Sequence, residues 1–152
     1  MFTVGLIGAG RIGRIHANTI VQYDGSQLVA VADSVYENAK NLAKTYGVNP
    51  TSVDEIFKDN SIESILIASS TDTHSDFIEK ASKARKAILC EKPVDLSLAR
   101  AKRCLENAKS NENSVMMGFN RRFDPNFVAL KNALDRGEIG KAELLSITSF
   151  DP

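Results

Sequence analysis

The chain has 152 residues, of which 43% are hydrophobic, and its 19 basic side chains balance 19 acidic ones. A chain of this length buries about two-thirds of the surface that its unfolded form exposes, so length alone suggests one globular domain with a substantial core. The charges are scattered, which argues against nucleic acid or a membrane surface as a partner. No apolar run approaches the ~20 residues of a membrane span, so we expect a cytoplasmic protein with a small, weakly charged ligand.

Apolar runs of strand length alternate with stretches of helical period as far as residue 118. Strands are predicted at 3–7, 28–32, 62–68, 87–90 and 115–118. Helices are predicted at 11–21, 37–46, 76–86 and 97–110, and 48–60 has room for a very short strand and one short helix capped by Ser52 or Asp54. Strands that are apolar on nearly every residue, with helices between them, indicate a parallel sheet covered on both faces. The prediction is a doubly wound α/β domain.

The chain after residue 119 has a different pattern. A helix is predicted over 121–140, ended by Gly137 and Gly140, and a strand over 141–150, whose alternation suits a half-buried sheet. A strand with no later strand to pair with is an association hazard. We therefore predict a first domain over 1–119 and, over 120–152, a connecting helix and the first strand of a truncated second α+β domain. Without the rest of that domain, residues 141–150 should be disordered, folded back or paired with a neighbouring chain.

The first predicted strand leads directly into the sequence GAGRIG, which has the form G-x-G-x-x-G and opens a predicted helix. In this context the glycines have separate roles: Gly8 makes the tight turn, Gly10 lets the backbone approach a pyrophosphate, and Gly13 allows close helix packing. The helix N-terminus would supply free N–H donors and partial positive charge to the phosphates.

An acidic residue follows at the distance that this motif requires. Asp33 ends the second predicted strand, about twenty residues after Gly13, where its carboxylate can accept hydrogen bonds from the adenine ribose and repel a 2′-phosphate. No arginine follows, because the next residues are SVY, so the pattern favours NAD over NADP and predicts a Rossmann NAD-binding fold. The alternative is a glycine turn that saves space and an aspartate that caps the following helix.

Polar clusters follow three of the predicted strands: SSTDTH after 62–68, EKP after 87–90 and FNRR after 115–118. Ligands of open α/β sheets bind beyond the carboxyl ends of the strands, so these clusters should share one rim. The predicted cofactor contacts are Gly8, Gly10, Arg11, Ile12, Gly13, Asp33, Ser70, Thr71, His74, Glu91 and Lys92.

Lys92 is the predicted catalytic residue and also a predicted substrate contact. An ammonium at the rim can donate to a substrate hydroxyl oxygen, and the bond strengthens as that hydroxyl becomes a carbonyl and negative charge develops. Pro93 restricts the local backbone and is a candidate for a cis peptide bond. The alternative is a surface Glu-Lys pair followed by a turn proline, since exposed ion pairs are common and contribute little.

The two histidines are weaker candidates. His74 could transfer a proton, but at a helix start it would more often hydrogen-bond locally. His16 lies inside the first predicted helix, where packing is the simpler expectation. The two are far apart in the sequence and have no accompanying ligand pattern, so no metal site is predicted.

The remaining rim residues admit two interpretations each. Arg122 could contact the substrate, or it could pair with Asp124 or Glu138, and for Arg121 the ion pair is favoured. Thr71 and Asp72 are expected to shape the nicotinamide side of the site through main-chain contacts.

The two cysteines, Cys90 and Cys104, are too few for a disulfide framework and lack C-x-x-C spacing. This agrees with a reducing compartment, and we expect both to be small buried hydrophobic residues.

The motifs VGLIGAGRIGRIHA, VAVAD, STDTHSDFI, CEKPVDL and GFNRRFDP together resemble the N-terminal half of the glucose-fructose oxidoreductase / inositol dehydrogenase (Gfo/Idh/MocA) family. The resemblance covers essentially the whole chain. It implies NAD-dependent transfer of a hydride from a ring hydroxyl of a cyclic polyol similar to myo-inositol. It also implies that Lys92 contacts the reacting oxygen, that Arg122 contacts the substrate, and that the protein is a homo-oligomer.

Family members continue for about as long again into a second domain, which carries an aspartate and a histidine that complete catalysis. Turnover by these 152 residues alone is therefore not expected, although NAD binding is. Two alternatives stay open: a dehydrogenase of another sugar or amino-sugar derivative in the same family, and a non-catalytic NAD-binding module.

Overall fold

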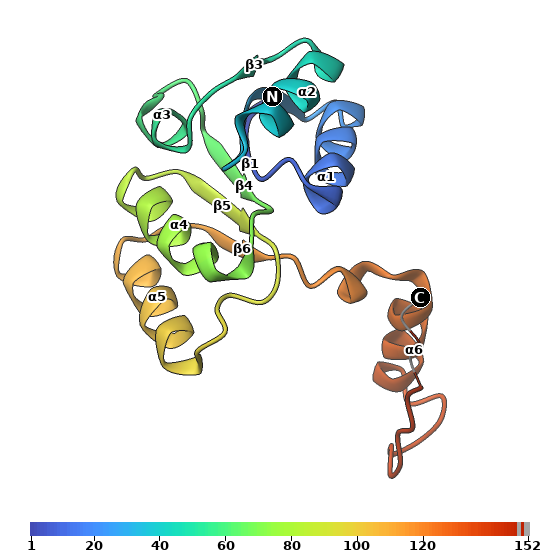
Figure 1. Ribbon diagram of the computed structural model, residues 1–152. Helices are drawn as coiled ribbons and strands as arrows, with labels where there is room; N and C mark the ends of the chain where they lie inside the picture. The colour runs from blue at the N-terminus through green and yellow to red at the C-terminus, as the bar shows by residue number, and fades with distance from the viewer. Residues whose placement is uncertain (149, 151–152) are drawn as a thin grey trace. The chain divides into compact units, whose positions relative to one another are not determined.

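The computed structural model describes residues 1–148 and 150, and the chain forms two compact units, Met1–Gly118 and Phe119–Pro152. The first unit is a parallel sheet with helices on both faces (Figure 1). The predicted boundary between residues 119 and 120 lies beside the division between the units. That the second unit begins a substrate domain stays a prediction.

The sheet of the first unit has six strands in the order β3-β2-β1-β4-β5-β6, and every adjacent pair is parallel. The strands are β1 (Phe2–Ile7), β2 (Ser26–Ala32), β3 (Asn49–Pro50), β4 (Ser64–Ile67), β5 (Ala87–Cys90) and β6 (Val115–Met117). This is the strand order of the Rossmann fold, in which the chain reverses its direction of travel across the sheet between β1 and β4. The predicted doubly wound fold is confirmed.

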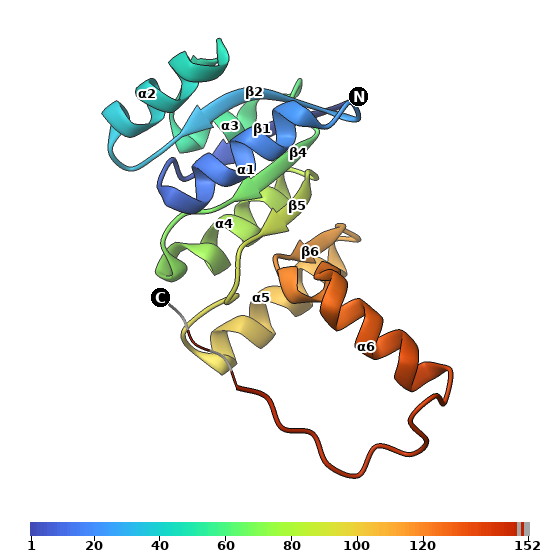
Figure 2. The same ribbon diagram turned by 90° about the vertical axis from the view of Figure 1, so that its right-hand side faces the viewer.

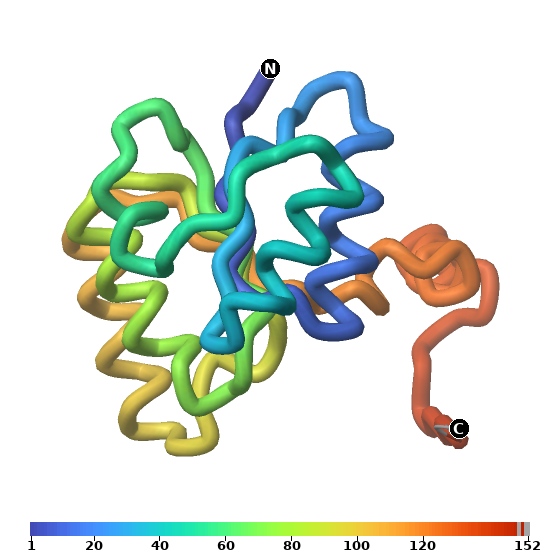
Figure 3. The backbone as a smooth tube through the Cα atoms, turned by 45° about the horizontal axis from the view of Figure 1, so that its top comes forward, coloured from blue at the N-terminus to red at the C-terminus, as the bar shows by residue number. Residues whose placement is uncertain are grey.

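Five helices cover the sheet: α1 (Arg11–Gln22), α2 (Tyr36–Tyr46), α3 (Val53–Lys58), α4 (Thr71–Lys83) and α5 (Leu98–Ser110). Helices α1 and α2 lie on one face, and α3, α4 and α5 lie on the other (Figure 2). Helices α4 and α5 run side by side (Figure 3), joined by Arg100, which donates to Glu79 at 2.6 Å and to Asp76 at 2.7 Å. These ion pairs help to hold the outer helix against its neighbour.

The central strands bury both of their faces. Leu6 and Leu66 belong to the core beneath α1 and α2, whereas Ile7 and Ile67 belong to the core beneath α3, α4 and α5. All four side chains are at most 4% exposed. Alternate residues of one strand thus serve two cores, which explains why these strands are apolar at nearly every position.

The start of α4 differs from the prediction. The helix was expected over 76–86, but it begins at Thr71 and ends at Lys83. The polar residues Ser, Thr and Asp that suggest a loop are also those preferred around a helix N-terminus, so composition could not separate the two. At the other end, Arg85 has a positive φ of 56°, which turns the chain before β5.

The second unit begins with a short 3₁₀ helix, η1 (Asn120–Phe123), followed by α6 (Pro125–Asp135). The single helix predicted over 121–140 is therefore wrong. Asp124 separates the two segments, and its carboxylate accepts hydrogen bonds from the N–H groups of Asn126 and Phe127 at 2.9 and 3.4 Å. Pro125 favours the first position of a helix and disfavours helical geometry in the residue before it, so the break was legible in the sequence.

The strand predicted over 141–150 is also wrong for the residues that the structure describes. Residues 141–148 and 150 form no strand, and residue 149 lies outside the described part of the chain. An alternating pattern provides a face to bury, but a strand needs a neighbouring backbone to receive its hydrogen bonds. In the described part of the second unit there is no such strand.

Both cysteines are free and buried, as predicted. Burial raises the pKa of the Cys90 thiol to about 12 and also raises the pKa of Cys104. Among the helices that the structure describes, none is long and apolar enough to cross a membrane.

The short helix α3 begins with a capping box. Ser52, one of the two predicted caps, accepts the Glu55 N–H, and the Glu55 carboxylate accepts the Ser52 N–H at 2.8 Å. The hydrogen bonds from Ser52 and Thr51 lower the pKa of Glu55 from 4.5 to about 2. Folding therefore favours the ionised form, so this stabilisation is fully present above pH 4.5 and is lost as the pH falls toward about 2.

We expect Glu55→Gln to reduce the fall in melting temperature between pH 5 and pH 2, because the variant has no carboxylate to protonate at the start of α3. Circular dichroism at a series of pH values measures the effect. Glu37→Gln is the matched control, because Glu37 pairs with Lys40 on exposed α2 without closing a capping box. Equal flattening in both variants would contradict the assignment to the cap.

Candidate cofactor site

The turn between β1 and α1 requires two of its three glycines for steric reasons. Gly8 has a φ of 106°, and a Cβ there would lie 2.4 Å from the carbonyl oxygen of Ala68. A Cβ on Gly13 would lie 1.9 Å from the carbonyl oxygen of Gly8. A Cβ on Gly10 would meet no described atom within 4 Å. The protein itself therefore leaves open space over Gly10, where a ligand could approach the backbone.

The N-terminus of α1 faces this open space. Gly10 is the N-cap and has no side chain to satisfy the first N–H groups, which leaves those of Arg11 and Ile12 able to donate to an anion. No acidic side chain lies in the first turn of the helix, so the positive end of its dipole is not neutralised there. These features fit a diphosphate.

Asp33 connects the glycine turn to the end of β2. Its Oδ2 accepts the Ala9 N–H at 2.7 Å, and its Oδ1 accepts the Val35 N–H at 2.8 Å. Oδ1 also accepts from the Ser34 hydroxyl at 3.5 Å, whereas Oδ2 keeps a second lone pair, so Asp33 can still accept a hydrogen bond from a ribose hydroxyl. The bond to Val35 just before α2 means that the two interpretations of Asp33, ribose contact and local cap, are compatible.

A cavity of about 240 Å³ lies beside the glycine turn, beyond the carboxyl ends of β1, β2 and β4. Its lining combines backbone at the turn, the carboxylate of Asp33, small polar residues and four apolar side chains: Ile7, Gly8, Gly10, Asp33, Ser34, Val53, Ala68, Ser69, Ser70, Thr73 and Phe77. Apolar walls with a few polar groups suit a nucleoside. The residues present therefore fit the cofactor that the sequence predicts.

The start of α4 forms another part of the rim. Ser70 is the N-cap and Thr71 the first helical residue, and the Ser70 side chain makes no capping hydrogen bond. Ser70 and Thr71 are thus placed at a second helix N-terminus beside the cavity, which is consistent with their predicted contact to the cofactor. That contact stays a prediction.

His74 is 1% exposed and lies in the first turns of α4. Its Nδ1 is 2.7 Å from the carbonyl oxygen of Pro93, and its Nε2 is 3.1 Å from that of Ser69. The local hydrogen bonding that the sequence favoured over catalysis is present. Its predicted cofactor contact stays a prediction, since both ring nitrogens face the main chain of the protein.

The sequence EKP follows β5 at the same edge of the sheet. The Glu91 N–H donates to the carbonyl oxygen of Ile67 at 2.9 Å, which continues the β4–β5 pairing to the rim. Lys92 is exposed, and within the described chain its ammonium has no hydrogen-bond or ion-pair partner. The Lys92–Pro93 peptide bond is cis, one of the two isomers that the sequence left open.

His16 is not simply a packing residue, which the sequence had favoured. Its Nε2 is 2.7 Å from Glu91 Oε1, and both side chains are about one-fifth exposed, at 22% and 20%. His16 lies three residues after Gly13, hence on the helix face that approaches the sheet. In the sequence, this spacing indicates that His16 faces the sheet, but it does not indicate that Glu91 is its hydrogen-bond partner.

The arginines of the second unit do not form the ion pairs considered from the sequence. Arg121 lies over the Phe127 ring, with its guanidinium carbon 5.6 Å from the ring centre. Glu138 pairs instead with Arg136 at 2.7 Å. The substrate contact of Arg122 stays a prediction.

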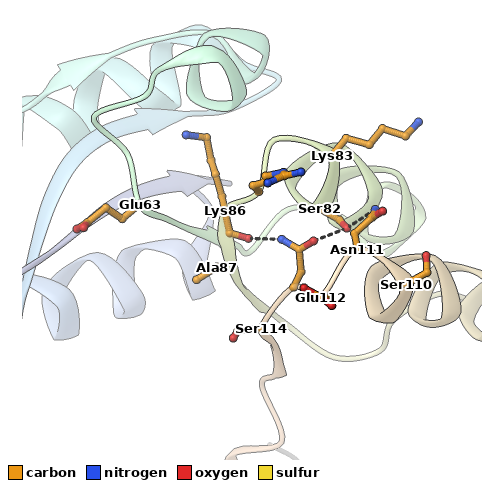
Figure 4. A pocket seen from close by; sticks show the side chains of 11 residues that line it. Glu63, Ser82, Lys83, Lys86, Ala87, Ser110, Asn111, Glu112 and Ser114 are labelled. Carbon is orange, nitrogen blue, oxygen red and sulfur yellow. Dashed lines mark hydrogen bonds between the residues drawn. The ribbon is translucent and has the colours of Figure 1, made fainter.

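A second hollow, of about 810 Å³, lies at the opposite edge of the sheet, beside the first residues of β5 and β6 (Figure 4). Its polar side chains bond to one another: Asn111 donates to Ser82 at 2.9 Å, and Ser82 donates to Asn113 at 2.8 Å. Lys86 extends away from this group, and its ammonium donates to two main-chain carbonyls of the segment before β4. These bonds are structural, and the hollow is remote from the glycine turn.

In residues 1–148 and 150, no three or more His, Cys, Asp and Glu side chains gather as they would around a metal ion. The rim instead combines a glycine turn, a helix N-terminus and a carboxylate after β2. Together with the strand order, these features define the class: a dinucleotide-binding Rossmann domain. Residues 2–119 match the Gfo/Idh/MocA model, described as an oxidoreductase family with an NAD-binding Rossmann fold, and the chain belongs to this family.

Curated relatives agree with this assignment. The chain is 45% identical over 148 residues to inositol 2-dehydrogenase of Rhizobium meliloti (strain 1021), a match that covers 97% of this chain and 45% of that protein. It is 40% identical over 151 residues to myo-inositol 2-dehydrogenase of Thermotoga maritima, covering 98% of this chain and 45% of the relative. The predicted family resemblance is confirmed.

A solved structure extends the comparison. Scyllo-inositol dehydrogenase from Lactobacillus casei, crystallised with NAD(H) and scyllo-inositol, matches with a TM-score of 0.87 at 28% identity, covering 92% of this chain and 42% of that one. The predicted NAD cofactor is also confirmed. The chain spans less than half the length of each of these relatives.

Gly10→Ala and Gly13→Ala should separate binding from folding. We expect Gly13→Ala to lower the free energy of unfolding by about 2 kcal/mol or more, because the new methyl group meets the Gly8 carbonyl. Gly10→Ala should cost less stability but weaken NADH binding by about tenfold or more, since its methyl group would fill the space left for the diphosphate. Urea unfolding and NADH fluorescence titration measure the two effects. Undiminished NADH affinity in Gly10→Ala would contradict the placement of the diphosphate.

Asp33→Ala should reduce the preference for NADH over NADPH by about tenfold or more, because the charged acceptor for the ribose is lost. Affinity for both cofactors should also fall, since Asp33 holds the Ala9 N–H of the glycine turn. Calorimetric titration of both cofactors gives the ratio. Asp54→Ala, which removes an exposed carboxylate paired with Lys80, is the control and should keep the wild-type ratio.

Proposed function

We propose that this chain is the NAD-binding part of an oxidoreductase that transfers a hydride from a ring hydroxyl of a cyclic polyol, similar to myo-inositol, to NAD⁺. The observation that carries the proposal is the exposed ammonium of Lys92, which has no partner among the described residues and lies at the sheet edge that also holds the glycine turn and Asp33. A positive donor beside a nucleotide site suits a substrate oxygen on which negative charge develops.

The direction of the cofactor follows from the asymmetry of the rim. Asp33 lies after β2, on one side of the glycine turn, so the adenosine half belongs on that side. With the diphosphate at the N-terminus of α1, the nicotinamide half belongs on the other side, toward β4 and β5. Lys92 follows β5 and is therefore on the side where the proposed hydride transfer would take place.

The substrate class is suggested by the relatives. The names of the two curated relatives above specify inositol or myo-inositol 2-dehydrogenases, and the solved structure contains scyllo-inositol together with NAD(H). The role of Lys92 in such a reaction is proposed by analogy with these proteins.

When bound, NAD⁺ supplies the carbon that accepts the hydride. Lys92 would donate a hydrogen bond to the reacting hydroxyl oxygen and stabilise its developing negative charge. His74 is enclosed and its ring nitrogens face two carbonyl oxygens, so it is poorly placed to accept the hydroxyl proton. We therefore infer that the proton acceptor lies outside Met1–Gly118, and that residues 1–152 alone bind NAD without turning over a polyol.

The test is a chimera in which this chain replaces the matched part of the Rhizobium meliloti enzyme, which supplies the residues that lie outside the match. We expect the chimera to reduce NAD⁺ in the presence of myo-inositol. Lys92→Met in the chimera should lower kcat by about 10²- to 10³-fold, because the donor to the reacting oxygen is lost, with little change in the KM for NAD⁺.

Lys102→Met is the matched control, since Lys102 is an exposed lysine on α5. Equal kcat values for Lys92→Met and Lys102→Met would contradict the role of Lys92 and favour a non-catalytic NAD-binding module. If the chimera were active with another sugar but not with inositols, the assignment as an oxidoreductase would stand and the proposed substrate would be wrong.

A further inference from the structure

Glu91, Lys92 and Pro93 form a short strap, residues 91–93, that leaves the carboxyl end of β5. The proposed chemistry uses only Lys92, and that side chain is free within the described chain. Its position therefore depends on how the backbone on either side of it is held. Two histidines, His16 and His74, make the relevant contacts.

His16 holds the first residue of the strap. A carboxylate oxygen can only accept, so the 2.7 Å contact is a hydrogen bond donated by His16 Nε2–H to Glu91 Oε1. The other carboxylate oxygen, Oε2, accepts the backbone N–H of Lys92 at 3.3 Å. The Glu91 side chain thus links α1 directly to the backbone of Lys92.

The backbone of Gly118, directly after β6, packs against the same carboxylate. A Cβ on Gly118 would lie 3.1 Å from both Cδ and Oε1 of Glu91, closer than ordinary packing. The Gly118 N–H donates to the carbonyl oxygen of Cys90 at 2.7 Å, so its position is set by the sheet. Glu91 is therefore held between a histidine and a backbone surface with little room to move.

His74 holds the last residue of the strap. The carbonyl oxygen of Pro93 accepts from His74 Nδ1 at 2.7 Å, and the next carbonyl, of Val94, accepts from the Ser75 hydroxyl at 3.2 Å. His74 and Ser75 are each 1% exposed, so water does not compete for these bonds. His74 Nε2 also lies 3.1 Å from the carbonyl oxygen of Ser69, which lines the nucleotide cavity.

We propose that His16 and His74 are positioning residues for Lys92, one holding the strap at Glu91 and the other at Pro93. This inference rests on the proposed role of Lys92. The two anchors come from opposite faces of the sheet, because α1 covers one face and α4 the other. Loss of either bond would let the strap rotate about the anchor that remains, while the glycine turn and Asp33 stay in place.

Asparagine and glutamine provide a crossed test, because each reproduces one nitrogen of histidine. The amide nitrogen of glutamine can take the place of Nε2, and that of asparagine the place of Nδ1. His16 donates from Nε2, so His16→Gln should keep its bond and His16→Asn should lose it. The His74 ring faces two carbonyl oxygens, and an imidazole with one N–H donates to only one of them. The shorter contact assigns that N–H to Nδ1 and the carbonyl of Pro93, so His74→Asn should keep this bond and His74→Gln should lose it.

The measurement uses the 152-residue chain with saturating NADH. Lysines are acetylated with a limiting amount of acetic anhydride, and the protection of Lys92 by NADH is quantified by peptide mass spectrometry. We expect wild-type protection in His16→Gln and His74→Asn, and a protection factor about tenfold lower in His16→Asn and His74→Gln, the effect of losing one strong hydrogen bond. NADH affinity should stay within about threefold in the two His16 variants.

The crossed pattern cannot arise from a general loss of stability, because the order of asparagine and glutamine reverses between the two positions. Equal protection of Lys92 in both variants of each pair would overturn the proposal.

If NADH fails to protect Lys92 even in the wild type, the proposed placement of Lys92 fails, and this inference fails with it. A similar loss of NADH affinity in both His74 variants would overturn the positioning role of His74 in favour of a direct cofactor contact. Where a variant at the buried position 74 does not fold, the pair at the partly exposed position 16 decides.

Discussion

The close approach of Gly13 to the carbonyl oxygen of Gly8 is the contact on which the rest of the site depends. Any side chain at position 13 would occupy the place of that oxygen, so only glycine lets α1 descend so far onto β1. The approach aims the N-terminus of α1 at the space over the turn. It also brings the turn to Asp33 on one side, while His16, further along the same helix, reaches Glu91 on the other. One helix placement thereby organises both halves of the rim.

Several polar side chains around the rim form hydrogen bonds within the protein. Asp33 and Glu91 each accept backbone N–H groups, and His74 contacts backbone carbonyls. Such bonds preorganise a site because little has to be reordered when a ligand arrives. Lys92 is the contrast, since its charged group is left available while the backbone that carries it is held. The proposed chemistry requires both: a fixed backbone at position 92 and a charged group that is available to the substrate.

Much of the fold could be predicted because its signals are local. The strand at 87–90 and the cap of α5 at Ser97 follow from short patterns of apolar and capping residues. The start of α4 was missed because the residues that favour helix N-termini also favour loops. The break at Pro125 was visible in the sequence but was outweighed by the helical period around it. The strand at 141–150 failed because pairing depends on a partner that no local pattern supplies.

In the site, too, the local features could be predicted from the sequence and the long-range contacts could not. The glycines and Asp33 were legible because their spacing is fixed by the turn they build, whereas the bond between His16 and Glu91 joins residues 75 positions apart. No sequence pattern near either residue specifies that distance. The role of Gly118 was equally hidden, because its importance lies in the carboxylate that rests on it.

Cys90 immediately precedes the strap, yet its thiol is fully buried and its pKa is raised to about 12. At neutral pH almost none of it is thiolate, which is the form that reacts with peroxides and electrophiles. A nucleophilic sulfur one residue from Glu91 could otherwise have made the proposed chemistry at this edge sensitive to oxidants. Its placement at the end of β5 allows the neighbouring amine to be exposed to solvent without exposing the sulfur to oxidative damage.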